Sequence, residues 1–251
     1  MTIDAGWAVV TGAGGGLGRA LARALAVRGR SVAALGRDMA ALRETAGEAY
    51  IHPVLCDLRD LAAIDAAFTA LEAERPVTTL VNNAAVYPRR DILDETAESF
   101  MESVATNLGG TVGCTLAALR GMIDRGEGRI LNVATFADVA PIPASAAYAT
   151  SKGAARVFTR ALVADLGDRF PGIVVGDWMP GMLATRMGVA EGLPPEVAAE
   201  WGAELALWHD PTLNGATFEM DTEIPPPRSL KRRLADRALF RRPVVRRLGT
   251  S

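Results

Sequence analysis

The sequence predicts an α/β protein built as a single Rossmann-fold domain, with a doubly wound parallel sheet of seven strands and helices on both faces. Two observations predict this fold. Short apolar runs typical of buried strands alternate with helix-like segments between residues 7 and 221. A glycine-rich turn also joins the first predicted strand to the first helix, which is the arrangement of a dinucleotide site.

Composition supports one globular domain, which we expect to span residues 1–227. With 251 residues, 49% of them hydrophobic and 22% charged, the chain can bury a substantial core. Cys56 and Cys114 are isolated cysteines in apolar surroundings, which favours a reducing compartment over a disulfide framework. The sequence shows no signal peptide, membrane span or metal-ligand cluster, so we expect a cytoplasmic protein.

Residues 228–251 form a basic tail that we expect to be partly helical. The tail carries nine basic side chains and one acidic side chain, a charge of +8, so residues 1–227 carry −10. Ser229 can cap a helix that Pro243 stops. We favour packing of this helix on the acidic body or on a neighbouring subunit. Contact with nucleic acid or an anionic membrane, and a role in covering the substrate pocket, remain as alternatives.

The first strand, Trp7–Thr11, leads into the glycine-rich turn and then into a helix that runs to about Gly29. Glycines let the backbone approach a pyrophosphate, and the helix N-terminus offers unpaired N–H groups. A flexible loop is the alternative interpretation. The candidate cofactor-binding residues of this turn are Gly12, Gly14, Gly16, Leu17 and Gly18.

The second strand, Val32–Leu35, ends at Gly36-Arg37, where a site for NAD(H) usually presents an acidic residue to the ribose hydroxyls. An arginine can instead bind a phosphate through two hydrogen bonds. Arg37 therefore favours NADP(H) over NAD(H). The alternative is that Arg37 faces solvent and that Asp38 partly offsets its charge.

Polar residues follow the third and fourth strands, which we expect at His52–Cys56 and Thr79–Asn82. Ligands collect at the carboxyl ends of parallel strands, so Asp57 and Leu58 are candidates for the adenine end of the cofactor. Asn83 and Ala84 indicate a place where the backbone closely approaches another group, with an ordinary asparagine-rich turn as the alternative. Helices that reach about Tyr50 and span Leu61–Glu74 precede these strands.

A helix expected over Glu98–Ala118 carries Asn107 near its middle. Asparagine competes for backbone hydrogen bonds, so this position needs a reason. Its side chain either binds water or a neighbouring carbonyl, or is simply exposed. The fifth strand, Gly128–Ala134, ends at the hydroxyl of Thr135.

Tyr148 and Lys152 lie one turn apart on a helix expected from about Ser145 to Phe170, and they therefore share a face. An ammonium beside a phenol favours the phenolate, lowers the phenol pKa and makes the tyrosine a usable acid or base. A surface pair without chemistry is the alternative for this pentapeptide taken alone.

The remaining elements complete the sheet. The sixth strand, Ile173–Val175, ends at the break Pro180-Gly181, with Thr185 shortly beyond it. A short irregular segment then leads to a helix that starts at Pro194-Pro195 and to a seventh strand at Gly215–Met220.

These motifs together resemble the short-chain dehydrogenase/reductase family, in its ordinary subtype of about 250 residues. The family's TGxxxGxG corresponds to Thr11–Gly18, its NNAG to Asn82–Ala85, its YxxxK to Tyr148–Lys152 and its PGxxxT to Pro180–Thr185. The motifs occur in the family's order and span residues 7–221. Thr135 stands where the family usually has serine.

The resemblance implies roles for individual residues. Tyr148 would exchange a proton with the substrate oxygen, Lys152 would hold the nicotinamide ribose and lower the phenol pKa, and Thr135 would bind the substrate oxygen. Asn107 would position a water in the proton relay. The remaining cofactor contacts would come from Asp57, Asn83, Pro180, Gly181, Leu183 and Thr185.

The resulting hypothesis is a reductase that transfers hydride from NADPH to a ketone or aldehyde, although a catalytic site does not itself determine the direction of the reaction. Alcohol oxidation with the same residues and an inactive dinucleotide-binding regulator are the alternatives. The resemblance also implies a homodimer or homotetramer. Plausible walls of the substrate pocket are Val86, Tyr87, Val139, Ile142, Trp178, Met182 and Met187.

Overall fold

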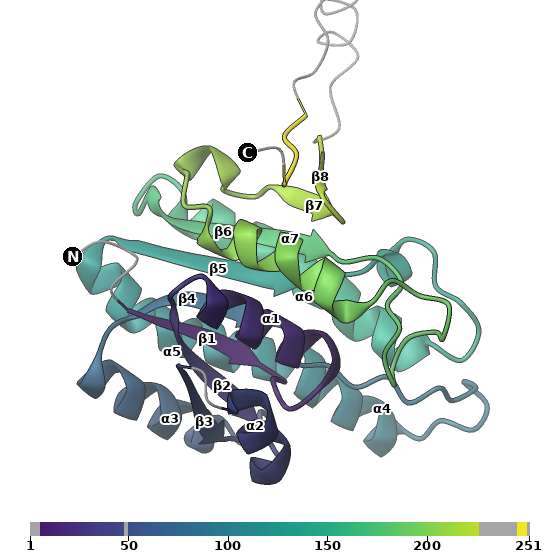
Figure 1. The fold of residues 1–251 in the computed structure, drawn as a ribbon. Coiled ribbons are helices and arrows are strands. Elements are labelled where there is room, and N and C mark those ends of the chain that lie inside the picture. The colour runs from purple at the N-terminus through teal and green to yellow at the C-terminus, as the bar shows by residue number, and fades with distance from the viewer. Residues whose placement is uncertain (1–5, 48–49, 226–244, 250–251) are drawn as a thin grey trace, which may run out of the picture.

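The structure, a computed structural model, describes residues 6–47, 50–225 and 245–249. These residues form a sheet of eight strands in the order β3-β2-β1-β4-β5-β6-β7-β8 (Figure 1). All neighbouring strands are parallel except β7 and β8. The predicted Rossmann-like fold class is therefore confirmed, with one additional antiparallel strand. The strands are β1 Trp7–Thr11, β2 Ser31–Gly36, β3 Ile51–Leu55, β4 Val77–Asn82, β5 Glu127–Val133, β6 Gly172–Met179, β7 Thr217–Glu219 and β8 Thr222–Ile224.

Helices cover both faces of the sheet, because successive residues of a buried strand point to opposite faces. Ala8 and Val10 of β1 belong to one hydrophobic cluster, whereas Trp7 and Val9 belong to the other. The first cluster includes the buried faces of α1 and α7, and the second includes those of α3 and α5. The helices are α1 Gly16–Val27, α2 Met39–Ala46, α3 Leu61–Glu74, α4 Ala97–Val104, α5 Gly110–Arg125, α6 Ala146–Leu166 and α7 Pro195–Leu207.

The chain reverses its winding direction at β1, which pairs with β2 on one side and with β4 on the other. Such a switch point leaves a crevice outside the carboxyl ends of the strands, where ligands of open α/β sheets bind. The glycine-rich turn after β1 and the asparagines at the end of β4 consequently lie beside one another at this edge.

The helix expected over residues 98–118 is interrupted. It consists of α4, a π-helical turn at Ala105–Gly109, and α5. A π-helical turn accommodates an extra residue within a helix and occurs frequently at functional sites. Asn107 lies in the middle of this turn and is fully buried.

Strand β8 was not expected from the sequence, and residues 245–249 return to it. Thr222 and Arg247 form an antiparallel bridge, while the backbone N–H of Glu223 donates to the carbonyl of Arg246. Arg246 also pairs with the Glu223 carboxylate through Nε at 2.8 Å, and Leu248 is only 3% exposed. We call residues 245–249 the return segment. The helix expected in the basic tail lies outside the described residues.

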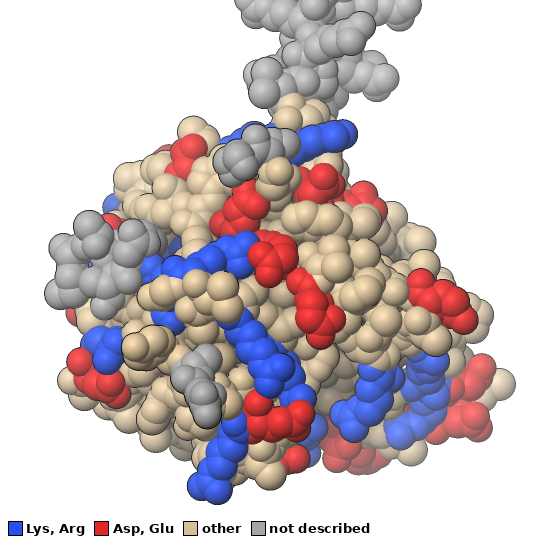
Figure 2. Space-filling view, in the orientation of Figure 1, with Lys and Arg blue, Asp and Glu red and all other residues tan. Residues whose placement is uncertain are grey.

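Charged side chains of both signs lie next to one another on the face that α1 and α7 form (Figure 2). Arg28 of α1 and Glu200 of α7 illustrate this pattern, with Nη2 2.6 Å from Oε2. Among the described residues, no helix has the length and apolarity needed to cross a membrane.

Candidate active site

The glycine-rich turn contains two glycines that internal packing requires. Gly12 has a φ of +66°, and a Cβ there would lie 2.8 Å from the Cα of Ala84. A Cβ on Gly18 would lie 2.2 Å from the carbonyl oxygen of Gly12 and 2.6 Å from the side-chain amide of Asn83. These two glycines therefore bring the start of α1 and the end of β4 together.

The middle of the turn is open. Gly15 and Gly16 are exposed, and a Cβ on Gly15 would meet no atom within 4 Å. Gly15 is the N-cap of α1, and no side chain caps this helix end. The first turn of α1 thus presents backbone N–H groups and a positive dipole end to an anion. Buried Leu17 anchors the helix below them, and Arg19 holds the turn through its hydrogen bond to the Gly14 carbonyl, 2.8 Å long.

The end of β4 is fixed to the end of β1 by hydrogen bonds. The Asn83 side-chain amide donates to the Thr11 carbonyl at 2.9 Å, and the backbone N–H groups of Asn83 and Ala84 both donate to the Thr11 hydroxyl at 3.0 Å. The close approach that the sequence indicated for Asn83 and Ala84 is therefore made to the glycine-rich turn of the protein itself.

Arg37 is exposed at the carboxyl end of β2 and forms no ion pair within the residues that the structure describes. Asp38 forms no ion pair with Arg37 in the described part of the chain, and its carboxylate instead caps α2 by accepting from Ala40 N at 2.9 Å and Ala41 N at 3.2 Å. Arg37 is thus left available for an anionic ligand.

Asp57 follows β3 and is held by a residue that sequence analysis did not single out. Arg59 donates to both of its carboxylate oxygens, from Nη2 at 2.6 Å and from Nε at 3.1 Å. These hydrogen bonds lower the pKa of Asp57 to about 2, with a further contribution from the charge of Arg37. Leu58 is buried and packs where a Cβ on Gly110 would clash.

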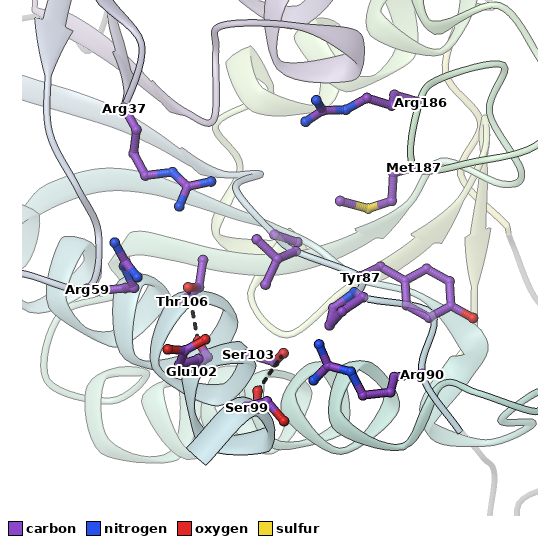
Figure 3. Close-up of a pocket in the computed structure, with 13 residues that line it drawn as sticks. Arg37, Arg59, Tyr87, Arg90, Ser99, Glu102, Ser103, Thr106, Arg186 and Met187 are labelled. Atoms are coloured by element: carbon purple, nitrogen blue, oxygen red, sulfur yellow. Dashed lines mark hydrogen bonds between the residues drawn. The ribbon is translucent and has the colours of Figure 1, made fainter. Parts of the chain in front are cut away.

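An open groove of about 420 Å³ runs along this edge of the molecule (Figure 3). Arg37 and Arg59 line one end, and the α4 side chains Ser99, Glu102 and Ser103 line one wall. The opposite wall carries side chains of the segment that follows β6. The other lining residues are Ala85, Val86, Tyr87, Pro88, Arg90, Thr106, Arg186 and Met187.

Tyr148 and Lys152 lie in the first two turns of α6, as expected. The ammonium of Lys152 is buried and donates to the carbonyl of Val133 at the end of β5, at 2.7 Å. Burial lowers the Lys152 pKa to about 8, and the negative charge of Asp177 opposes this shift. A buried lysine is therefore placed one helical turn from the phenol.

Burial dominates the environment of the Tyr148 phenol. Its pKa is raised above the ordinary value mainly because of burial, and the hydrogen bond with the Thr135 side chain acts in the opposite direction. The expected lowering of the Tyr148 pKa by Lys152 is not found in this structure: the pKa is raised, and the Lys152 charge is not among the causes of the shift. Thr135 also caps a short 3₁₀ turn, since its hydroxyl accepts from Ala137 N at 3.3 Å.

Asn107 connects three segments around the site. Its side-chain oxygen accepts from the backbone N–H of Val86 at 2.7 Å, and its amide donates to the Val86 carbonyl at 3.0 Å and to the Ser151 hydroxyl at 2.9 Å. Ser151 in turn donates to the carbonyl of Tyr148. The side chain thus binds a neighbouring carbonyl, which was one of the two alternatives, and it is not exposed.

Pro180 and Gly181 end β6, and Gly181 has a φ of +85°. The following residues, Met182–Leu193, fold into a closed loop that we call the lid segment. Leu183 forms a parallel bridge with Leu193, and Thr185 approaches the start of α1, where a Cβ on Gly16 would lie 3.4 Å from its methyl group. Trp178 does not line the pocket as expected, since it is fully buried in the core against α7.

Two residues near the site make contacts that we did not predict from the sequence. Tyr87 stacks on Tyr148 with ring centroids 4.6 Å apart, although it was expected only as a pocket wall. Arg59 forms an ion pair with Asp57, two residues before it. An acidic and a basic residue this close in the sequence could have indicated the pair. The stacking of Tyr87 joins positions far apart in the chain and had no local signal.

The parallel sheet, the open glycine turn and a Tyr/Lys pair at the carboxyl edge together define a dinucleotide-dependent oxidoreductase of the Rossmann type. The sequence profile of the short chain dehydrogenases matches residues 6–193. The chain belongs to this family, whose members are NAD(P)-dependent oxidoreductases that act on CH–OH and C=O groups.

Curated relatives and solved structures support the same assignment. Galactitol 2-dehydrogenase (L-tagatose-forming) of Cereibacter sphaeroides is 33% identical over 79% of this chain and 80% of its own length. Carbonyl reductase (NADPH) 2 of Sus scrofa is 37% identical over 76% of this chain and 77% of its own length. A variant of actinorhodin polyketide ketoreductase, solved with NADPH, has a TM-score of 0.80 at 28% identity, and the match covers 87% of this chain and 96% of that chain.

Proposed function

We propose that the protein reduces a ketone or aldehyde with NADPH and that Tyr148 donates the proton. The observation that carries this proposal is the placement of Tyr148 beside the Thr135 hydroxyl, one helical turn from buried Lys152. The carbonyl reductase of Sus scrofa and the ketoreductase solved with NADPH support the reductive direction and the cofactor.

The residues present fit such a cofactor. The exposed turn at Gly14–Gly16 and the uncapped N-terminus of α1 would hold the diphosphate. Arg37, which has no ion-pair partner among the described residues, would bind the 2′-phosphate. Asp57 and Leu58 would lie at the adenine, while Asn83 and Ala84 would lie beside the adjacent ribose. Pro180, Gly181, Leu183 and Thr185 would contact the nicotinamide carboxamide.

The reduced nicotinamide supplies the hydride in this reaction. The protein holds the substrate oxygen with the hydroxyls of Thr135 and Tyr148, and Tyr148 transfers its proton as negative charge develops there. Lys152 would hold the nicotinamide ribose beside the phenol. Asn107 fixes the backbone at Val86 and, through Ser151, the helix turn that carries Tyr148.

Replacement of the proposed proton donor tests this function. Tyr148→Phe keeps the ring and its packing but removes the proton, so we expect kcat to fall by at least about a thousandfold while NADPH still binds. Turnover is measured as loss of NADPH absorbance with a panel of carbonyl compounds, and binding as NADPH fluorescence. Full activity in this variant would exclude Tyr148 as the donor.

Cofactor preference is tested at Arg37. Arg37→Gln should weaken NADPH binding about tenfold or more and leave NADH binding within about twofold, because only NADPH carries the phosphate. Both affinities are measured by titration of cofactor fluorescence. Equal losses for the two cofactors, or a native enzyme that prefers NADH, would remove the role given to Arg37.

Oxidation of an alcohol is the second candidate function, and the similarity to galactitol 2-dehydrogenase favours it. The same residues serve both directions, with Tyr148 acting as the base in oxidation. Initial rates in both directions, measured with matched ketone and alcohol pairs, decide between them.

Assembly and location are further parts of the proposal. We propose a homodimer or homotetramer on the basis of the family resemblance, which light scattering on the purified protein tests. A reducing compartment such as the cytoplasm is supported by Cys56 and Cys114, which are free and buried. Burial raises the pKa of Cys56 to about 11, which keeps the thiol unreactive.

A further inference from the structure

Tyr87 forms an aromatic wall directly against the proposed proton donor. It lies in the connection between β4 and α4, and its ring stacks on that of Tyr148 with a centroid separation of 4.6 Å and an interplanar angle of 27°. A ring in this position restricts rotation of the Tyr148 phenol and occupies space on one side of it. Negative charge on the Tyr87 phenol also raises the Tyr148 pKa.

Arg89 joins the Tyr87 ring to the lid segment. Its guanidinium carbon lies 5.6 Å from the ring centroid, and Nη2 donates to the carbonyls of Met187 at 3.2 Å and Gly188 at 2.8 Å. One guanidinium therefore binds two carbonyls at one end and the π-face of Tyr87 at the other. Arg89 thus links the Tyr87 ring to the lid segment.

The lid segment is closed by hydrogen bonds within its own backbone. Leu193 N donates to the Met182 carbonyl at 2.8 Å, and Val189 N donates to the Leu183 carbonyl at 3.0 Å. Gly188 N donates to the carbonyl of Thr185 at 3.0 Å. The Gly188 carbonyl that Arg89 binds therefore belongs to a loop that is held in shape by its own hydrogen bonds.

We propose that Arg89 and Tyr87 are positioning residues for Tyr148, which tie the orientation of the phenol to the position of the lid segment. The inference rests on the proposed catalytic role of Tyr148. It assigns to Arg89 a task at the active site although its side chain is exposed and does not reach the phenol. It also makes Tyr87 a specificity-determining residue, because a substrate group on that side of the phenol must fit against an aromatic ring.

A double-mutant cycle tests this connection. Tyr87→Leu removes the ring, and Arg89→Met removes the hydrogen bonds and the charge while keeping most of the side-chain length. Each single variant should lower kcat by about tenfold, since small displacements of a reacting group cost this much or more. NADPH affinity should stay within about twofold. The double variant should lose no more than Tyr87→Leu alone, because both residues act through one contact.

Two further variants separate positioning from general damage. Tyr87→Phe keeps the stacked ring and should restore most of the kcat lost in Tyr87→Leu. Arg75→Met is the matched control, because Arg75 also lies over an aromatic ring, Trp7, at 4.5 Å, yet belongs to the opposite end of the sheet. It should leave kcat unchanged even where it lowers the melting temperature.

Additive losses in the double variant, or full kcat in Tyr87→Leu, would overturn the inference. A loss in Tyr87→Phe as large as that in Tyr87→Leu would do the same, because the hydroxyl and not the stacked ring would then be responsible. The proposed function fails separately, through an active Tyr148→Phe enzyme. The inference alone fails when Tyr148→Phe is inactive but the Tyr87 and Arg89 variants behave like the native protein.

Discussion

Asp177 is a buried carboxyl group in β6 that lies behind the proposed catalytic lysine. Its Oδ1 accepts from the Thr159 hydroxyl at 2.7 Å, and Thr159 accepts from the amide of Asn132 at 2.9 Å. Burial raises the Asp177 pKa to about 6, although the charges of Arg156, Arg160 and Lys152 act in the opposite direction. The fold therefore retains a carboxylate that is costly to ionise and that supports the charge of Lys152.

The pH dependence of stability follows from this residue. An unfolded carboxyl ionises near 3.8, whereas the folded group ionises at about 6, so the folded state binds its proton more tightly. The protonated Asp177 side chain contributes to the free energy of unfolding below about pH 4, and this contribution is lost as the pH rises to 6. Asp177→Asn should therefore be more stable than the native protein above pH 6, by about 2–3 kcal/mol, and lose this advantage near pH 4.

Chemical denaturation at several pH values measures this difference. Asp165→Asn, an exposed position on α6, is the control and should show no such pH-dependent gain. A gain that persists unchanged at pH 4 would contradict the assignment. The kcat of Asp177→Asn provides a second readout of whether Lys152 depends on this carboxylate.

Site residues that stand out through their neighbours in the sequence could be predicted. Roles that depend on contacts between distant segments could not. Tyr148 and Lys152 were found because their spacing matches one helical turn. Asn107 was noticed because asparagine is unfavourable within a helix, but its bonds to Val86 depend on a contact between distant segments. The stacking of Tyr87 on Tyr148 had no counterpart in any local pattern.

At the scale of single elements, the glycine turn shows two different uses of the same residue. Gly12 and Gly18 allow the protein to pack on itself, while Gly15 leaves open space beside the N-terminus of α1. The sequence predicted Gly12 and Gly18 as contacts of a cofactor and did not single out Gly15. It could not separate these uses, because the distinction depends on Ala84 and Asn83 from another strand.

Alanine substitutions distinguish these two kinds of glycine. Gly18→Ala should lower the free energy of unfolding by about 1–3 kcal/mol, because its Cβ would lie 2.2 Å from the Gly12 carbonyl oxygen. Gly15→Ala should leave stability within about 0.5 kcal/mol, since this residue is exposed, has an extended φ of −176° and would meet no atom within 4 Å. Urea denaturation measures both. Equal effects would show that the turn is rearranged in solution.

At the scale of the whole molecule, alternation of strands and helices was sufficient to predict the parallel part of the sheet. Crossover connections between parallel strands are almost always right-handed, which limits the topologies that this alternation allows. Strand β8 could not be predicted in the same way. It has only three residues, and it is bounded on its outer side by the return segment, which follows a long intervening stretch.

Removal of the return segment should destabilise the whole domain. A chain that ends at Val244 loses buried Leu248 and leaves Glu223 without Arg246, so we expect a loss of about 2 kcal/mol in the free energy of unfolding. NADPH binding should remain, because the segment lies at the far edge of the sheet from β1. Calorimetry compares this chain with one that ends at Gly249, and equal stability of the two would contradict the expectation.

The return segment also determines where an attached label or fusion partner would sit. Gly249 N donates to the Glu204 carboxylate on α7 at 2.9 Å, so Gly249 is a fixed point on that helix. A group joined after Ser251 is separated from this point by two residues, a reach of about 7 Å. A fluorophore at the C-terminus would therefore report distances from the α7 face of the domain, and its tether would not include the basic stretch that precedes the return segment.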